Sequence, residues 1–203
     1  MSLRLARVLG LLCLVVSLVA CGDSGTSQSY EQRVMQDRVQ RDMQMREKNS
    51  VVAPSLRSDF RGLNYYPVDT SHRYVVPLQR YDAPDTVRVA ESTGTVSEQV
   101  VVGTVAIPFP QKTTPLVVFK VRSGSERGKL WIPFADSTNG ASTYTAGRYV
   151  DLQPHGGDSV VVDFNRAYNP TCAYDPNFAC PLPPPENRLA LGIPAGEKKP
   201  SFR

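Results

Sequence analysis

Residues 98–109 read EQVVVGTVAIPF, and this stretch decides the expected fold. After Glu98 it carries no charge, and it is nearly continuous in Val, Gly, Ala and Ile. β-Branched residues favour an extended backbone, and a strand that is apolar at successive positions is typical of one covered on both faces. We therefore predict a strand here that is buried on both sides.

Similar runs lie on both sides of this stretch, each ended by turn residues. In 85–91, Val87 and Val89 share one face because side chains alternate along a strand. Turn signals include Ala83-Pro84 and the sequence HGGD at 155–158. The other predicted strands are 73–80, 85–91, 115–121, 129–134, 143–152 and 159–164. No second helical pattern interrupts them, so we predict an all-β fold, an antiparallel sandwich or barrel.

One helix is predicted before the β domain. Met35, Val39 and Met43 recur every four residues, and at two places an acidic residue stands four positions before an arginine, which supports a helix. We expect this narrow stripe to pack on the domain edge or to space the domain from a membrane. A helix that binds a partner is the alternative. The predicted divisions after the signal peptide are a tether at 21–28, a helix at 29–49, a β domain at 50–198 and a tail at 199–203.

The start of the chain resembles the export signal of a bacterial lipoprotein. A basic segment precedes 13 apolar residues at 8–20, and residues 18–21 read LVAC, which resembles a lipobox. A membrane-spanning helix needs about 20 apolar residues. We therefore predict a signal peptide over 1–20, acylation of Cys21 and a flexible tether after it.

Acylation would make a membrane the first partner of this protein. A lipoprotein cysteine carries a diacylglyceryl group, and two acyl chains anchor stably where one does not. Gly22 follows the cysteine, and the absence of Asp at that position resembles the signals that sort lipoproteins to the outer membrane. We predict that the protein is anchored in the outer membrane and faces the periplasm.

The charge of the chain argues against a nucleic-acid partner. Loss of residues 1–20 removes two of the 23 basic residues and none of the 19 acidic ones, which leaves a net charge of +2 over 183 residues. Nucleic-acid binding requires a clustered basic surface.

Two cysteines remain after processing and acylation, Cys172 and Cys180. An even pair in an exported domain predicts a disulfide, which would close a nine-residue loop and stabilise the fold by about 2.5 kcal/mol. Metal or redox chemistry is the alternative, but the spacing is not C-x-x-C and the chain has only two histidines. We expect neither a metal nor a cofactor, and no catalytic motif for nucleotides, zinc or serine hydrolysis is present.

Polar and aromatic residues gather late in the sequence and form the predicted ligand site. Arg148 is the expected clamp for an anion or carboxylate, with acids and amides as orienting groups and tyrosine as a wall. The alternative is a buried network that ties the following loop to the sheet. The candidate residues are Asp136, Tyr144, Arg148, Asp163, Asn165, Asn169, Glu186 and Asn187.

The segment 165–187 is rich in proline and lacks periodicity. Its prolines and the expected disulfide would lower the entropy lost when it becomes ordered. We weigh two roles for it, a binding loop and a strap that covers a sheet edge.

Several motifs together resemble an uncharacterised bacterial family of unknown function. They read GRYVDL at 147–152, DFNRAYNPTCAY at 163–174 and CPLPPPEN at 180–187. The resemblance covers roughly residues 35–198. It implies that this region is one fold unit and leaves its activity open.

Three functions follow as hypotheses. The first is a non-catalytic ligand-binding or envelope-associated domain at a membrane surface. The second is a hydrolase of envelope glycans or esters that uses a carboxylate pair from among Asp136, Asp151, Asp163 and Glu186, which must lie within about 10 Å of each other. The third is a structural protein of envelope assembly, which a large exposed apolar patch would favour.

Overall fold

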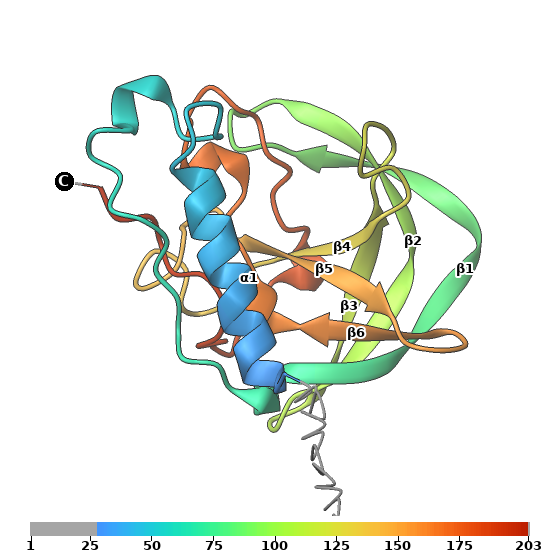
Figure 1. Ribbon diagram of the computed structural model, residues 1–203. Coiled ribbons are helices and arrows are strands. Elements are labelled where there is room, and N and C mark those ends of the chain that lie inside the picture. The colour runs from blue at the N-terminus through green and yellow to red at the C-terminus, as the bar shows by residue number, and fades with distance from the viewer. Residues whose placement is uncertain (1–27, 203) are drawn as a thin grey trace, which may run out of the picture.

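The computed structural model describes residues 28–202, and within them six antiparallel strands close into a barrel (Figure 1). The strands pair in sequence order, and the last pairs back with the first. The predicted antiparallel β fold is confirmed, in its barrel form. The predicted signal peptide and Cys21 lie outside the described residues. The strands are β1 (Arg73–Ala90), β2 (Val96–Pro108), β3 (Thr113–Lys120), β4 (Leu130–Phe134), β5 (Arg148–Pro154) and β6 (Ser159–Asp163).

β1 joins two predicted strands into one, so the predicted turn at Ala83-Pro84 is wrong. Its first five residues pair with β6, and residues 78–80 and 85–90 pair with β2. The register with β2 shifts between Arg80 and Asp85, and the residues between them are exposed. Proline has no amide hydrogen for a ladder, and an interrupted ladder accommodates it without ending the strand.

The stretch around β2 is buried toward the barrel interior, but the predicted burial of its other side is only partial, because Thr104 and Ala106 are half-buried. Val105 and Ile107 are fully buried in the barrel interior, whereas Val101 packs outside the barrel with Phe119 and other residues. β2 is bonded to β1 and β3 along its length. At Gly103 the chains approach so closely that a Cβ atom would lie 2.2 Å from the Gln79 carbonyl oxygen.

One helix, α1 (Tyr30–Met45), lies against the side of the barrel (Figure 1). Ser29 and Gln32 form a capping box at its start, which satisfies two backbone amides there. The helix ends at Met45, four residues before the predicted end. Met45 packs with Val52 and Phe60 in a small separate core. No helix within residues 28–202 is long and apolar enough to cross a membrane.

The predicted apolar stripe of α1 does not pack on the domain. Met35, Val39 and Met43 are 48%, 57% and 64% exposed. The buried face carries Val34 and Arg38 instead. Two faces of α1 carry residues at helical spacing, one with Met35, Val39 and Met43 and the other with Val34 and Arg38. The barrel covers the second face.

The segments after β6 cover the barrel core. Short 3-10 turns and extended chain run across it, and Ile193 and Ala195 insert into the barrel core. Asn187 links β3 to β4 beyond the two residue pairs that these strands share: its amide bonds both backbone groups of Val117 and the Pro133 oxygen. The 3-10 turns are η1 (Pro54–Leu56), η2 (Thr70–His72), η3 (Phe164–Arg166), η4 (Thr171–Ala173) and η5 (Pro185–Asn187).

Candidate functional site

The eight candidate residues from the sequence fall into separate hydrogen-bond networks. Six of them are buried, namely Asp136, Arg148, Asp163, Asn165, Asn169 and Asn187. Tyr144 is half-buried and its hydroxyl donates to the Cys172 oxygen at 3.3 Å, while Glu186 is exposed. The structure therefore does not gather them in one pocket.

Arg148, at the start of β5, is fully buried and bonded on both terminal nitrogens. One donates to the Asp136 carboxylate at 2.7 Å and to the Ile193 oxygen at 3.0 Å. The other donates to the backbone oxygens of Ala195 and Glu197. Burial lowers the pKa of Arg148, and the charge of Asp136 opposes that shift. Arg148 holds residues 193–197 to the barrel, so it belongs to a buried network, but not to one that ties the segment 165–187 to the sheet as the alternative to an anion clamp proposed.

Asp163 and Asn165 fix the start of α1 to the end of β6. The Tyr30 hydroxyl donates to both Asp163 oxygens at 2.8 and 2.9 Å, and the Asn165 amide donates to the same hydroxyl at 3.0 Å. Burial and the neighbouring Asp163 raise the pKa of Tyr30. The Asn165 side chain also bonds both backbone groups of Asp69. These contacts place α1 against the barrel.

Asn169 bonds a buried acid that the sequence did not single out, Glu197. The Asn169 amide donates to Glu197 Oε1 at 2.7 Å, and Arg41 Nε lies 3.4 Å from Oε2. Glu197 is fully buried, and burial raises its pKa to about 7 while Arg41 opposes the shift. Glu197 therefore changes charge near neutral pH beneath an arginine of α1.

The two cysteines are free thiols, so the predicted disulfide is not confirmed. Both are buried, and the Cys172 amide donates to the Cys180 sulfur at 3.0 Å. Hydrogen bonding from the Cys180 thiol lowers the pKa of Cys172 to about 6, with help from Ser92 and Tyr144. The pair sits close together with one sulfur disposed to ionise.

The carboxylates of the hydrolase hypothesis all serve in other contacts, except the exposed Glu186. Asp136 pairs with Arg148, and Asp163 bonds Tyr30. Asp151 accepts from Tyr168 at 2.9 Å and from Lys129 at 2.8 Å. Glu186 lines a cavity with Asp85 and Arg88, and Asp151 lines another with five further charged side chains.

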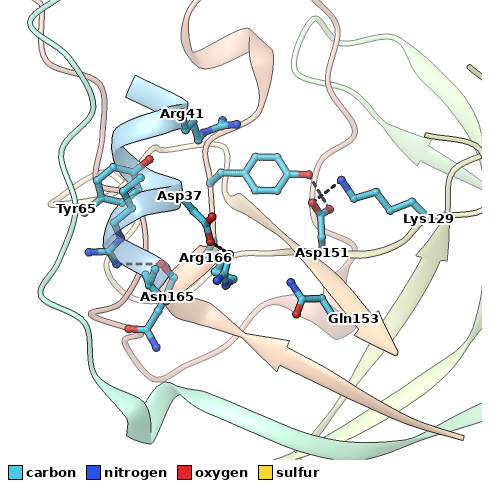
Figure 2. Close-up of a pocket in the computed structure, with 12 residues that line it drawn as sticks. Asp37, Arg41, Tyr65, Lys129, Asp151, Gln153, Asn165 and Arg166 are labelled. Carbon is cyan, nitrogen blue, oxygen red and sulfur yellow. Dashed lines mark hydrogen bonds and ion pairs between the residues drawn. The ribbon is translucent and has the colours of Figure 1, made fainter. Parts of the chain in front are cut away.

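This cavity of about 340 Å³ lies between α1 and the barrel wall. Figure 2 shows Asp37 and Arg41 on the helix and Lys129, Asp151 and Gln153 on the barrel side. The segment that follows β6 supplies the floor. The lining residues that carry charge are Asp37, Arg38, Arg41, Lys129, Asp151 and Arg166.

Four of the lining residues are positively charged and two are negatively charged, while Glu126, Asp163 and Glu197 pair with three of the four cations from outside the lining. Arg166 pairs with Asp37 and Asp163, and Lys129 pairs with Asp151 and Glu126. Arg38 is 8% exposed and, among the described residues, has no carboxylate partner. It donates to the backbone oxygens of Tyr66 at 2.8 Å and Asn165 at 2.9 Å. A buried guanidinium with only neutral acceptors adds uncompensated charge to the wall.

Two buried polar atoms of the lining residues, Arg38 Nε and the Tyr65 hydroxyl, have neither a hydrogen-bond nor an ion-pair partner within residues 28–202. Arg41 Nε makes no hydrogen bond there, but it lies 3.4 Å from the Glu197 carboxylate. Unpartnered buried donors are rare in native proteins. Two tyrosine rings back these arginines, with Arg38 4.5 Å from the Tyr65 ring and Arg41 5.0 Å from the Tyr168 ring. The wall thus combines unpartnered donors, positively charged side chains and aromatic surface.

The spacing of residues along α1 is a sequence signal for this site. Val34, Arg38, Arg41 and Met45 are spaced by four, three and four residues, so they share one face of α1. Apolar residues stand at both ends of this face and arginines in the middle. Such a face predicts a helix that packs at its ends and leaves a polar space between.

Comparisons with known proteins identify a fold and no activity. Residues 58–198 match a family model described as "Protein of unknown function (DUF1684)". The solution structure of an uncharacterised protein of Haloarcula marismortui, gene locus rrnAC0354, is similar with a TM-score of 0.66 and 31% identity, over 83% of this chain and 94% of that one. No curated protein matches the chain. The expected resemblance to a family of unknown function agrees with these matches.

We predict that Arg148→Met destabilises the protein by about 3 to 5 kcal/mol, because the buried Asp136 carboxylate loses its cation and three backbone oxygens lose donors. Arg122→Met is the control, because Arg122 forms an exposed ion pair with Glu98, and it should cost less than about 1 kcal/mol. Urea unfolding measures both. Equal effects would contradict the role assigned to Arg148.

Glu197→Gln should change how stability depends on pH. The folded protein keeps a proton on Glu197 up to about pH 7, whereas the unfolded chain releases it near pH 4.5, so wild-type stability falls as pH rises between these values. Glutamine does not titrate and can still accept from Asn169. The difference in unfolding free energy between wild type and variant should shift by about 3 kcal/mol from pH 4 to pH 8, against the wild type at high pH. A constant difference would show that Glu197 is ionised throughout.

Proposed function

Because the chain belongs to the DUF1684 family, whose function is unknown, we propose a role from the cavity beside α1: a non-catalytic, membrane-anchored protein that binds a small organic anion. The observation that carries this proposal is the pair of unpartnered donors on Arg38 and Tyr65 beside Arg41, whose only charged partner within residues 28–202 is the titratable Glu197. An anion in the cavity would accept from these donors and neutralise the charge of Arg38. Hydrogen bonds to charged groups contribute about 1.5 to 3 kcal/mol each.

The size and walls of the cavity fit a ligand with a carboxylate or phosphate group and a small neutral body. A volume of about 340 Å³ is at the lower end of the range for ligand pockets. The arginines would hold the anionic group, as planar guanidinium groups do. Asp151 and Gln153 on the barrel side offer acceptors and an amide to the neutral part.

Glu197 gives this site a pH dependence. When ionised, its carboxylate competes with a ligand for Arg41, from which it is 3.4 Å away. When protonated, it leaves the Arg41 charge to the ligand. Because the pKa of Glu197 is raised to about 7, anion binding should strengthen as pH falls through neutrality.

The anchor belongs to the same proposal. The basic segment, the short apolar run and the LVAC sequence support a lipoprotein acylated at Cys21. The residue after the cysteine supports the outer membrane, with the domain in the periplasm. In that location the binding domain would capture its ligand near the membrane surface.

The cysteine pair fits an oxidising compartment. The Cys172 thiol has a lowered pKa and lies beside Cys180, and a thiolate is the nucleophile of disulfide formation. In thiol–disulfide exchange, an oxidised dithiol of a partner would accept the two electrons and the two protons of the pair. We propose that the exported protein carries this disulfide. It would join η4 to residues 180–182, which bond the backbone at the end of β1.

Binding is tested by calorimetry with sulfate, inorganic phosphate, glucose 6-phosphate and glucose. We expect the three anions to bind and glucose not to bind. Arg41→Gln should weaken anion binding by about 10- to 100-fold, because one charged donor is lost. Arg33→Gln is the control, because Arg33 is exposed on the same helix and does not line the cavity.

Sulfate stays doubly charged near neutral pH, so it isolates the effect of Glu197. Its affinity for wild type should rise between pH 8 and pH 6, and Glu197→Gln should remove that change. If glucose binds as well as glucose 6-phosphate, or if Arg41→Gln binds anions as wild type does, the cavity is not an anion site.

Mass spectrometry of the full chain expressed in a bacterial host tests the anchor and the disulfide together. We expect residues 1–20 to be absent, a diacylglyceryl mass on Cys21 and the loss of two hydrogens from the peptides that carry Cys172 and Cys180. An unmodified Cys21 with residues 1–20 intact would disprove the anchor.

A further inference from the structure

The outward face of α1 carries no charge. Helical geometry at 100° per residue places six residues on this face, all exposed. Three are large apolar side chains and three are uncharged amides. The six are Gln32, Met35, Gln36, Val39, Gln40 and Met43. A helix face that only meets water is typically charged or polar, so this face is built for another surface.

The apolar surface continues beyond the helix. A groove of about 470 Å³ runs beside Met35, Val39 and Met43. Its other wall includes Leu63 and Pro67, from the segment that precedes the barrel. The exposed stripe is therefore the ridge of a broader apolar surface.

The length of chain between Cys21 and α1 limits how far this face can lie from a membrane. Seven residues lie between Cys21 and Ser29, the N-cap of α1, and the eight steps from Cys21 to Ser29 span at most about 28 Å when fully extended. This step rests on the anchor of the proposed function. An acylated Cys21 would hold the start of α1 within about 28 Å of the bilayer, a little more than the length of the 16-residue helix, and no other described element follows so directly.

We infer that the outward face of α1 docks on the lipid surface to which Cys21 is anchored. The helix lies in the plane of the interface, with Met35, Val39 and Met43 at the boundary of the acyl chains and the glutamines at the level of the headgroups. The anion cavity is lined by the opposite face of the helix, with Arg38 and Arg41. Docking in this orientation directs the barrel into the aqueous phase and keeps the cavity off the bilayer.

The experiment uses the full chain, processed and acylated by its host, in vesicles of phosphatidylethanolamine and phosphatidylglycerol with brominated acyl chains. Met43→Trp places a fluorophore on the docking face. Val96→Trp is the matched control, because Val96 is 50% exposed and lies at the start of β2, away from α1. The native Trp131 is present in both variants, and its contribution is measured in wild type and subtracted. Brominated lipid should quench the added tryptophan at least threefold more in Met43→Trp than in Val96→Trp.

The outcomes separate the docking from the anchor. A lipid on Cys21 with equal, weak quenching of both variants would overturn the docking and leave the anchor in place. An unmodified Cys21 would remove the anchor, and the docking with it. A dimer of the detergent-solubilised protein that Met43→Gln dissociates would show that a second copy covers this face, which would also overturn the inference.

Discussion

The buried guanidinium of Arg148 is the contact on which the rest of the molecule depends. It stands where β5 begins and bonds both the Asp136 carboxylate after β4 and the backbone of residues 193–197. That C-terminal segment carries Ile193 and Ala195 into the core and places Glu197 beneath Arg41. One charged group thus holds the C-terminal segment against the barrel and, through that segment, fixes Glu197 behind the cavity. A buried ion pair adds little net stability, but it requires one arrangement of its partners, because any other would leave a charge unpaired.

The cavity follows from how α1 meets the barrel. Tyr30 bonds Asp163 near the start of the helix, and Met45 enters a small core at its end. Between these two attachments, Arg38 and Arg41 are too long and too polar to pack flat on the barrel wall. They bond backbone oxygens and a titratable acid, and Arg38 Nε has no partner within residues 28–202. The same attachments turn the uncharged face of α1 outward, so the cavity and the apolar face are two results of one docking geometry.

Strands were more predictable than sites in this chain. β2 and its neighbours could be identified from continuous or alternating apolar residues, because burial in a sheet has a local signature. Ala83-Pro84 was misleading, since the same dipeptide suits a turn and an interrupted ladder. Arg148 and Asp136 stood among the eight candidate residues, but nothing in their local sequence distinguishes a ligand clamp from a buried support. Glu197 was missed because nothing around it in sequence differs from a polar tail.

The sequence by itself determined the antiparallel β class and the single N-terminal helix. These depend on alternation and spacing, which are local. The tertiary structure alone decided that the sheet closes into a barrel, which face of α1 is buried, and that Arg38, Arg41 and Glu197 share one site. Those outcomes depend on contacts between residues far apart in the sequence, such as Arg73 with Asp163 and Arg41 with Glu197, and local periodicity carries no information about which distant surfaces meet.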